Sequence, residues 1–254
     1  MAIRWFLPTV LLALCRCTYP TEAGDRPGSV IAGHGQTFSL VGSRPAPGQI
    51  DVSPDRPMDL LFSGPPQAET AVPATIRLFA GVIESHGHLT TDLLDQRIRF
   101  TPLTPLEPGL RYQAYVQREV SGLNGASLDR TVIFNFTTGD HQRDPAPPPP
   151  PPVTAADLQP TWTAHCSSCH RAPNPPGGVD LSSPQASVAS LRNVAVSHGS
   201  KRRVFVGDHA RSYLMFKLLG VGGYVGFPMP PDRPALRRAD LRRVVTWIDG
   251  GATP

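Results

Sequence analysis

Two cysteines and a histidine stand together at one point of this 254-residue sequence, Cys166-Ser167-Ser168-Cys169-His170. Thiol and imidazole groups bind metals and take part in redox chemistry, so this cluster is the strongest chemical signal in the chain. Two thiols three positions apart on a helical turn can reach two points of one rigid molecule. The adjacent histidine can then place an imidazole nitrogen beneath that molecule.

The order C-x-x-C-H is the attachment signature of c-type haem. In such sites the two thiols bond to the two vinyl groups of one porphyrin, and the histidine binds the iron axially. We therefore expect a single covalent haem c held through Cys166, Cys169 and His170.

Three other uses of the motif stay open. A zinc site would need two more ligands, for which His165, His198 and His209 are candidates, but the sequence has no second C-x-x-C. A thioredoxin-like redox pair expects a strand before the motif, whereas the preceding residues favour a helix. A plain disulfide between the two cysteines is the third.

Met229 is the expected second axial ligand of the iron. It lies in Gly226-Phe227-Pro228-Met229-Pro230-Pro231, where flanking prolines would stiffen a loop and present the sulfur. Met215 is the alternative methionine, although its apolar neighbours favour a place in a helix core. A bis-histidine arrangement would use His198 or His209 instead.

Helices joined by Gly- and Pro-containing loops are expected around these ligands. The first spans Ala155 to Cys169, with Thr154 as its N-cap. The second spans Ser212 to Leu219 and ends at Gly220. The third begins at Pro234 or Ala235 and runs to Asp249, with apolar residues on one broad face and several arginines on the other.

The C-terminal 95 or so residues resemble the bacterial cytochrome c-like family. After the C-x-x-C-H motif come Gly177-Gly178-Val179-Asp180-Leu181-Ser182, Val206-Gly207-Asp208, Met229-Pro230-Pro231 and a closing Trp247-Ile248-Asp249-Gly250-Gly251-Ala252. The resemblance implies a compact helical fold, ligation by His170 and Met229, and one-electron transfer. It also implies that Trp162 and Trp247 pack where the first and last helices cross. The stretch from Ala195 to Arg203 fits the family least.

Residues 37–140 show a different pattern, of short strands between turn residues. Alternation puts Ile98 and Phe100 on one face, and does the same for Tyr112, Ala114 and Val116 and for Val132, Phe134 and Phe136. Turn residues recur between these segments, as at Pro108-Gly109 and Asn124-Gly125. This spacing predicts an antiparallel β-sandwich.

The segment Leu106-Glu107-Pro108-Gly109-Leu110-Arg111-Tyr112 resembles the tyrosine corner of immunoglobulin-like sandwiches. The wider run, closing with Phe134-Asn135-Phe136-Thr137-Thr138-Gly139, resembles bacterial Ig-like domains of the S-layer type. That resemblance implies a spacer or adhesion module without chemistry of its own. His86 and His88 form a possible metal-binding His-x-His pair, but two exposed loop histidines are the simpler interpretation.

The chain divides into five segments. Residues 1–17 read as a basic and apolar export signal in which Leu12-Ala13-Leu14-Cys15 resembles a bacterial lipobox, so Cys15 is the expected lipidation site, although Leu14 departs from that pattern. Residues 18–36 read as a flexible tether, 37–140 as the sandwich and 154–254 as the haem domain. The linker, 141–153, contains six consecutive prolines and predicts a stiff polyproline II spacer.

Charge is distributed unevenly along the chain. Residues 18–152 contain 10 Arg and 14 Asp or Glu, whereas residues 153–254 contain 12 Lys or Arg and 6 Asp. A basic C-terminal half favours an acidic partner surface. Nothing resembles a nucleic-acid-binding module.

These observations predict a multidomain protein: an Ig-like antiparallel β-sandwich followed by a small all-α cytochrome c-like domain. The expected function is one-electron transfer to a redox partner protein, not catalysis. The expected place is the cell envelope outside the cytoplasm, with the N-terminal lipid in a membrane. The alternatives are a haem enzyme or gas sensor, if Met229 does not bind the iron, and a surface adhesion or scaffold protein.

Overall fold

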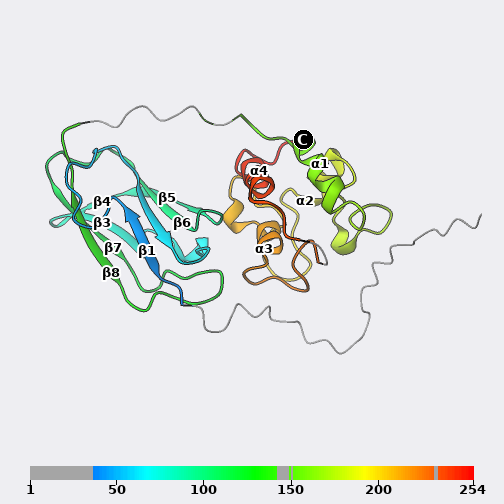
Figure 1. Cartoon of the computed structure of the whole chain (residues 1–254), viewed down its shortest axis with the longest axis horizontal. Helices are drawn as coiled ribbons and strands as arrows, with labels where there is room; N and C mark the ends of the chain where they lie inside the picture. Colours follow the sequence, from blue (N-terminus) through cyan, green and yellow to red (C-terminus); the bar gives the residue numbers. More distant parts are fainter. Residues whose placement is uncertain (1–36, 142–148, 150, 232–233) are drawn as a thin grey trace, which may run out of the picture.

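The computed structural model describes residues 37–141, 149, 151–231 and 234–254. Two halves lie side by side, a sandwich of strands and a group of short helices (Figure 1). The strands are β1 (Leu40–Arg44), β2 (Met58–Phe62), β3 (Ile76–Ala80), β4 (Ile83–Ser85), β5 (Gly87–Asp92), β6 (Arg97–Pro102), β7 (Arg111–Val116) and β8 (Val132–Thr137). The helices are η1 (Ala68–Thr70), α1 (Ala155–His165), η2 (Pro176–Gly178), α2 (Pro184–Leu191), η3 (His209–Arg211), α3 (Tyr213–Leu219) and α4 (Arg238–Asp249).

The sandwich consists of two four-stranded antiparallel sheets, in the orders β1-β2-β6-β5 and β4-β3-β7-β8. The alternating residues of the expected inner strands supply its core, since Ile98, Phe100, Ala114 and Val116 are all buried. The sequence did not indicate β1, β4 or β5. All three are edge strands, which need little apolar alternation because one side of each is open.

The expected tyrosine corner is present. The backbone N–H of Glu107 donates to the Tyr112 hydroxyl at 2.8 Å, and the Tyr112 side chain is buried. The hydroxyl of Thr138 donates to the Glu107 carbonyl at 2.6 Å, which ties the end of the last strand to the same corner. The sandwich prediction is therefore confirmed down to one of its diagnostic hydrogen bonds.

The helical half begins and ends its helices close to the expected residues. Thr154 caps α1 through a capping box with Asp157, and Gly220 ends α3 in the left-handed conformation at φ 65°. Two expected boundaries were wrong: α1 ends at His165, short of the cysteines, and α4 begins at Arg238 after an extended Arg237. Helix α2 was not expected from the sequence.

Helices α1 and α4 contact each other, and both tryptophans named above are fully buried in the core around them. The chain end ties the two helices together. The Thr253 carbonyl accepts from Trp247 Nε1 at 2.8 Å and from the Ala155 backbone N–H at 2.9 Å. The positions expected for Trp162 and Trp247 thus agree with the structure.

The two halves share a core, which the expected stiff spacer did not suggest. The turn between β5 and β6 points toward the helices (Figure 1), and Leu93 and Leu94 in that turn are buried in the helical core together with Ala68. The described residues therefore do not form two domains with fully separate cores. The eight linker residues 142–148 and 150 lie outside the described part of the chain.

Ion pairs surround this buried turn. Arg242 of α4 donates to Asp92 at 2.8 Å and to Asp95 at 2.6 Å, and Arg238 donates to Asp95 at 2.6 Å. These ion pairs are partly buried beside the apolar contact of the turn, and they help to fix the orientation of the turn relative to α4. Among the described residues, none of the helices has the length and apolar character to cross a membrane.

Candidate functional site

The C-x-x-C-H motif forms a hydrogen-bonded turn directly after α1. The backbone N–H of Cys166 donates to the Trp162 carbonyl at 2.8 Å, and that of His170 donates to the Cys166 carbonyl at 2.9 Å. The Ser167 hydroxyl donates to the Trp162 carbonyl at 3.1 Å and, across to the next loop, to the Leu181 carbonyl at 2.7 Å. The two cysteines and the histidine therefore share one hydrogen-bonded turn, in which Cys169 is disulfide-bonded.

The imidazole of His170 is held in one orientation. Its Nδ1 lies 3.1 Å from the carbonyl oxygen of Val179 and donates to it, while the Leu181 N–H donates to the His170 carbonyl at 2.8 Å. Burial lowers the pKa of His170 below its ordinary value, the Val179 contact opposes this, and the charge of Lys217 adds to the lowering. The side chain is thus a neutral imidazole with the Nε2 lone pair available, which is the form that binds iron.

Met229 lies in the loop between α3 and α4. Its backbone N–H donates to the Lys217 carbonyl at 2.8 Å, and its side chain is half-buried against the helical core. Met215, the alternative methionine, is fully buried inside that core on α3. Of these two methionines, Met229 is therefore the one whose side chain is partly exposed.

Lys217 fastens the Met229 loop to α3, a role that the sequence did not reveal. Its Nζ donates to the carbonyls of Val225 at 2.7 Å and Phe227 at 2.6 Å, and lies 5.0 Å from the ring centroid of Tyr224. Burial lowers the pKa of the Lys217 ammonium.

The two alternative histidine ligands lie elsewhere. His209 is buried at the junction of the halves, where Nδ1 donates to Asp249 at 2.8 Å and Nε2 accepts from the Leu93 N–H at 3.3 Å. Both of its ring nitrogens are therefore engaged. His198 is exposed in the stretch that fits the cytochrome family least.

A buried donor close to the motif bears on the same site. Among the described residues, the Trp162 indole Nε1 is buried and has no hydrogen-bond partner. An unsatisfied buried donor costs free energy, so it favours a polar group from outside the chain, such as a haem substituent. The His170 imidazole and the half-buried Met229 thioether are of the donor types that bind haem iron, whereas Cys169 is disulfide-bonded in this structure.

The zinc and thioredoxin-like alternatives receive less support. Within the described ranges, the one group of three His, Cys, Asp or Glu side chains close enough to share an ion is Asp51, Asp140 and His141, all exposed. The motif cysteines are not part of such a group. The element before the motif is helix α1, not the strand that a thioredoxin-like site expects.

The other expected sites are the lipidation cysteine and the His-x-His pair. Cys15, the expected lipidation site, lies outside the described residues together with the signal segment and the tether. His86 and His88 are exposed, as expected, but His88 lies on strand β5 and not in a loop.

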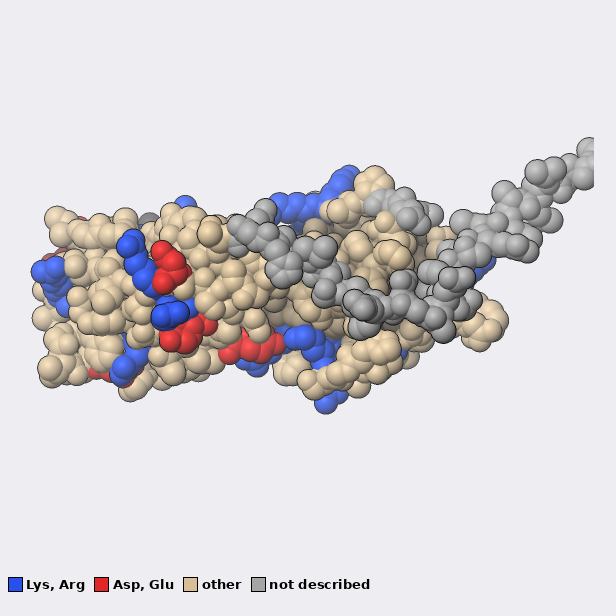
Figure 2. All heavy atoms as spheres, turned by 90° about the horizontal axis from the view of Figure 1, so that it is seen from below, with Lys and Arg blue, Asp and Glu red and all other residues tan. Residues whose placement is uncertain are grey.

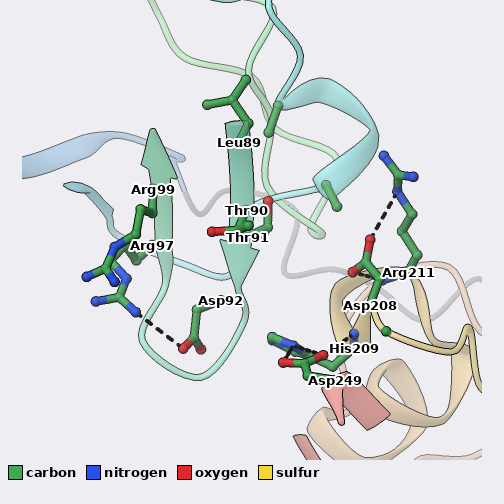
Figure 3. Close-up of a pocket in the computed structure, with 13 residues that line it drawn as sticks. Leu89, Thr90, Thr91, Asp92, Arg97, Arg99, Asp208, His209, Arg211 and Asp249 are labelled. Carbon is green, nitrogen blue, oxygen red and sulfur yellow. Dashed lines mark hydrogen bonds and ion pairs between the residues drawn. The ribbon is translucent and has the colours of Figure 1, made fainter. Parts of the chain in front are cut away.

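A polar cleft of about 400 Å³ opens where the sandwich meets the helices (Figure 3). Thr90, Thr91 and Asp92 of β5 form one wall, and Asp208 and His209 lie opposite them. Burial raises the pKa of Asp208. The cleft arises from the docking of the two halves, so no local motif marks it in the sequence.

On the face shown in Figure 2, the sandwich carries acidic and basic side chains side by side, and acidic ones also lie at its junction with the helices. The charged side chains visible on the helical part are basic, in agreement with the excess of Lys and Arg over Asp in residues 153–254.

Comparison with known proteins identifies the first half of the chain. Residues 35–138 match the family model described as bacterial Ig-like domain. No curated protein matches the chain. Among solved structures, the N-terminal part of the bacterial S-layer protein SbsC is similar at 16% identity and a TM-score of 0.33, covering 47% of this chain and 26% of that one.

Two further solved structures are similar over a somewhat smaller share of this chain. L,D-transpeptidase 1 of Mycobacterium tuberculosis shares 20% identity at a TM-score of 0.29 and covers 40% of this chain and 39% of that one. The copper resistance protein PcoC of Escherichia coli shares 16% identity at a TM-score of 0.32 and covers 39% of this chain and 97% of that one. This chain therefore carries a bacterial Ig-like domain at residues 35–138, followed by a helical half that lies outside the family match.

Proposed function

We propose that the chain is an exported c-type cytochrome that passes single electrons between redox partners. The main observation for this proposal is the orientation of His170, which follows directly after the C-x-x-C pair. Its Nδ1 donates to the carbonyl of Val179 in the next loop. That contact leaves Nε2 as the ligand atom, and such outer-shell partners fix the tautomer and direction of metal-binding histidines.

In this proposal each residue has a defined task. When haem c is bound, Cys166 and Cys169 would supply the covalent thioether bonds, Cys169 after reduction of the disulfide that it makes in this structure, and His170 and Met229 would hold the iron. Haem c, when bound, supplies one iron that alternates between two oxidation states. Ser167 and Lys217 hold the two ligand-bearing loops, and Trp162 offers its indole N–H to a polar substituent.

Ligation by Met229 separates electron transfer from the haem enzyme or gas sensor. A thioether ligand fills the last coordination position and raises the reduction potential relative to harder donors. With His170 and Met229 both holding the iron, no position would remain open for a substrate or gas, which is why we propose an electron carrier and not an enzyme. The basic helical surface would then bind an acidic redox partner and speed the encounter.

The location belongs to the same proposal. Attachment of haem c takes place outside the cytoplasm, and the basic and apolar start of the chain fits export. A bacterial Ig-like domain is consistent with the cell envelope. Lipidation at Cys15, with a membrane anchor in consequence, is proposed on the lipobox-like residues alone.

The test is a visible absorption spectrum of the oxidised and the reduced full-length protein, exported from cells that have the cytochrome c maturation machinery. The proposal expects sharp c-type bands and the weak long-wavelength band of methionine–iron ligation. Met229→Ala should abolish that weak band, and Met215→Leu, the matched control, should keep it. An unchanged spectrum in Met229→Ala would support the gas sensor or haem enzyme instead. A colourless protein would rule out haem binding.

A surface scaffold or adhesion protein is the second candidate, favoured by the match of residues 35–138 to a bacterial Ig-like domain. In that case the sandwich makes the functional contact and the helical half is an accessory. Binding of the full-length protein to isolated envelope material, undiminished in a Cys166→Ala/Cys169→Ala variant, would favour it. Binding lost with the cysteines would argue against it.

A further inference from the structure

Four arginine side chains meet at one hollow on the outer face of the sheet β1-β2-β6-β5. The hollow has a volume of about 320 Å³ and is lined by Arg44, Arg56, Pro57, Asp59, Arg97 and Arg99. Strand register explains the gathering. Arg44 on β1 lies opposite Asp59 on β2, and Asp59 lies opposite Arg99 on β6, so these three side chains share one face.

Asp59 satisfies one of the four guanidinium groups. Arg99 donates to Asp59 through Nε at 2.6 Å and through Nη2 at 2.9 Å, a two-point ion pair. This pair fixes the centre of the hollow. The other three arginines are not matched in this way.

Arg97 shares carboxylates without binding any of them closely. It lies 3.5 Å from Asp59, 3.6 Å from Asp92 and 3.7 Å from Asp95, all beyond ordinary hydrogen-bond length. Its Nε is buried and has no partner in the part of the chain that the structure describes. Figure 3 shows the Arg97 and Arg99 guanidinium groups side by side, directed away from His209.

Arg44 and Arg56 complete the set, and both are exposed. Within the described ranges, the recorded ion pairs include neither of them. A guanidinium group carries five N–H donors in a planar fork that matches the oxygens of carboxylate, phosphate or sulfate. The hollow thus holds four positive charges against the carboxylate of Asp59 in its lining, and the carboxylates of Asp92 and Asp95 lie beside Arg97.

This cluster of positive charge contrasts with the net negative charge of the sandwich segment. Residues 18–152 contain 10 Arg and 14 Asp or Glu, with no Lys, so the segment as a whole is acidic. Four of those ten arginines nevertheless line one hollow of the sheet. Mutual repulsion disfavours such a cluster unless an anion offsets it.

We propose that this hollow is a binding site for a multivalent oxyanion, a ligand with at least two carboxylate, phosphate or sulfate groups. Arg44 and Arg56 contact one group, and Arg97 contacts the second beside the Arg99–Asp59 pair. This site is independent of the proposed electron transfer. The ligand is either a small free anion or an anionic group carried on a polysaccharide.

The test is titration calorimetry on the full-length protein at low salt with two probes, inorganic pyrophosphate and polygalacturonate. Arg44→Gln and Arg56→Gln should each weaken binding about tenfold, the loss expected for one charge-assisted contact. Arg130→Gln removes an exposed arginine of the same domain outside the hollow and is the matched control for net charge. Unchanged thermal unfolding in all three variants would show that the fold is intact.

Each outcome decides the proposal. Tight binding of pyrophosphate alone supports the site with a free anion as ligand, and binding of polygalacturonate alone supports it with a polymer. No binding of either probe overturns the site. Equal weakening by Arg130→Gln also overturns it, because general charge attraction would then explain the result.

Discussion

The sandwich and the helical half are organised by different means. In the sandwich, six antiparallel strand pairs carry the structure, with a register shift only in the β1–β2 pair, between Leu40 and Gly42, and alternating strand residues supply much of the core. In the helical half, short helices are joined by long loops that side chains hold in place. Arg203 illustrates this, since its guanidinium donates to the carbonyls of Gly177, Gly178 and Ser190.

The difference explains why the two halves are recognised in different ways. A periodic pattern is spread over 100 residues, so a family model detects it. In the helical half, a few side chains hold the loops through hydrogen bonds to backbone carbonyls, such as those of Ser167, His170 and Lys217. Three substitutions and a change of pH test this contrast between the halves.

Replacing Leu93 with Ala should have the largest effect, because this sandwich residue is fully buried in the helical core. We expect a loss of about 2–5 kcal/mol of unfolding free energy, the usual range for a buried leucine. The loss should appear in the helical signal as well as in the sandwich signal in urea unfolding. Leu103→Ala, at a position 58% exposed, is the control. A normal helical signal in Leu93→Ala would show that the halves are independent.

Tyr112→Phe removes the hydroxyl of the tyrosine corner and leaves the Glu107 N–H without its acceptor. We expect a loss of about 1–3 kcal/mol, measured by urea unfolding. Tyr115→Phe is the matched control, since its hydroxyl bonds to Gln113 at an exposed site. The helical half should keep its haem spectrum in both variants. Loss of that spectrum in Tyr112→Phe would mean that the sandwich governs the site.

Lys217→Met removes two charge-assisted hydrogen bonds that hold the Met229 loop while keeping the apolar stem. We expect a cost of about 1–3 kcal/mol and a weaker methionine–iron band, with the covalent haem retained. Lys201→Met is the control, because Lys201 makes an exposed ion pair with Glu69 instead. An undiminished band in Lys217→Met would show that the loop does not need this anchor.

Acid should loosen the junction of the halves through Asp92. Burial opposes its charge, but hydrogen bonds from the Asp95 backbone and from Arg242 outweigh this and lower the pKa of Asp92 below 3.8. Its contribution is therefore present above pH 3.8 and is lost as the pH falls through the lowered value. We expect about 1 kcal/mol, seen as a smaller acid sensitivity of unfolding in Asp92→Asn. Equal acid sensitivity in both proteins would contradict this assignment.

The sequence correctly predicted the features that depend on local patterns of residues. The alternation at Tyr112, Ala114 and Val116, the Thr154 cap and the Gly220 stop were all expected and are present. These features depend on neighbours within a few positions of the chain, so the sequence alone is enough to predict them.

Features made by distant residues were missed for a physical reason. The insertion of Leu93 into the helical core, the engagement of both nitrogens of His209 and the Lys217 clamp join segments far apart in sequence or depend on the path of a loop. The same holds for the arginine hollow, because Arg44, Arg56 and Arg97 look like scattered surface charges until the strand register brings them together.

The most direct test of the central claim is the intact mass of the denatured full-length protein, produced with the cytochrome c maturation machinery. We expect a mass increase of one haem that survives denaturation and acid–acetone extraction. Cys166→Ala/Cys169→Ala should lack it, and Cys17→Ala, which changes a cysteine outside the motif, should retain it. A wild-type protein without the added mass would contradict a covalent haem c and return the motif to its zinc, redox-pair or disulfide alternatives.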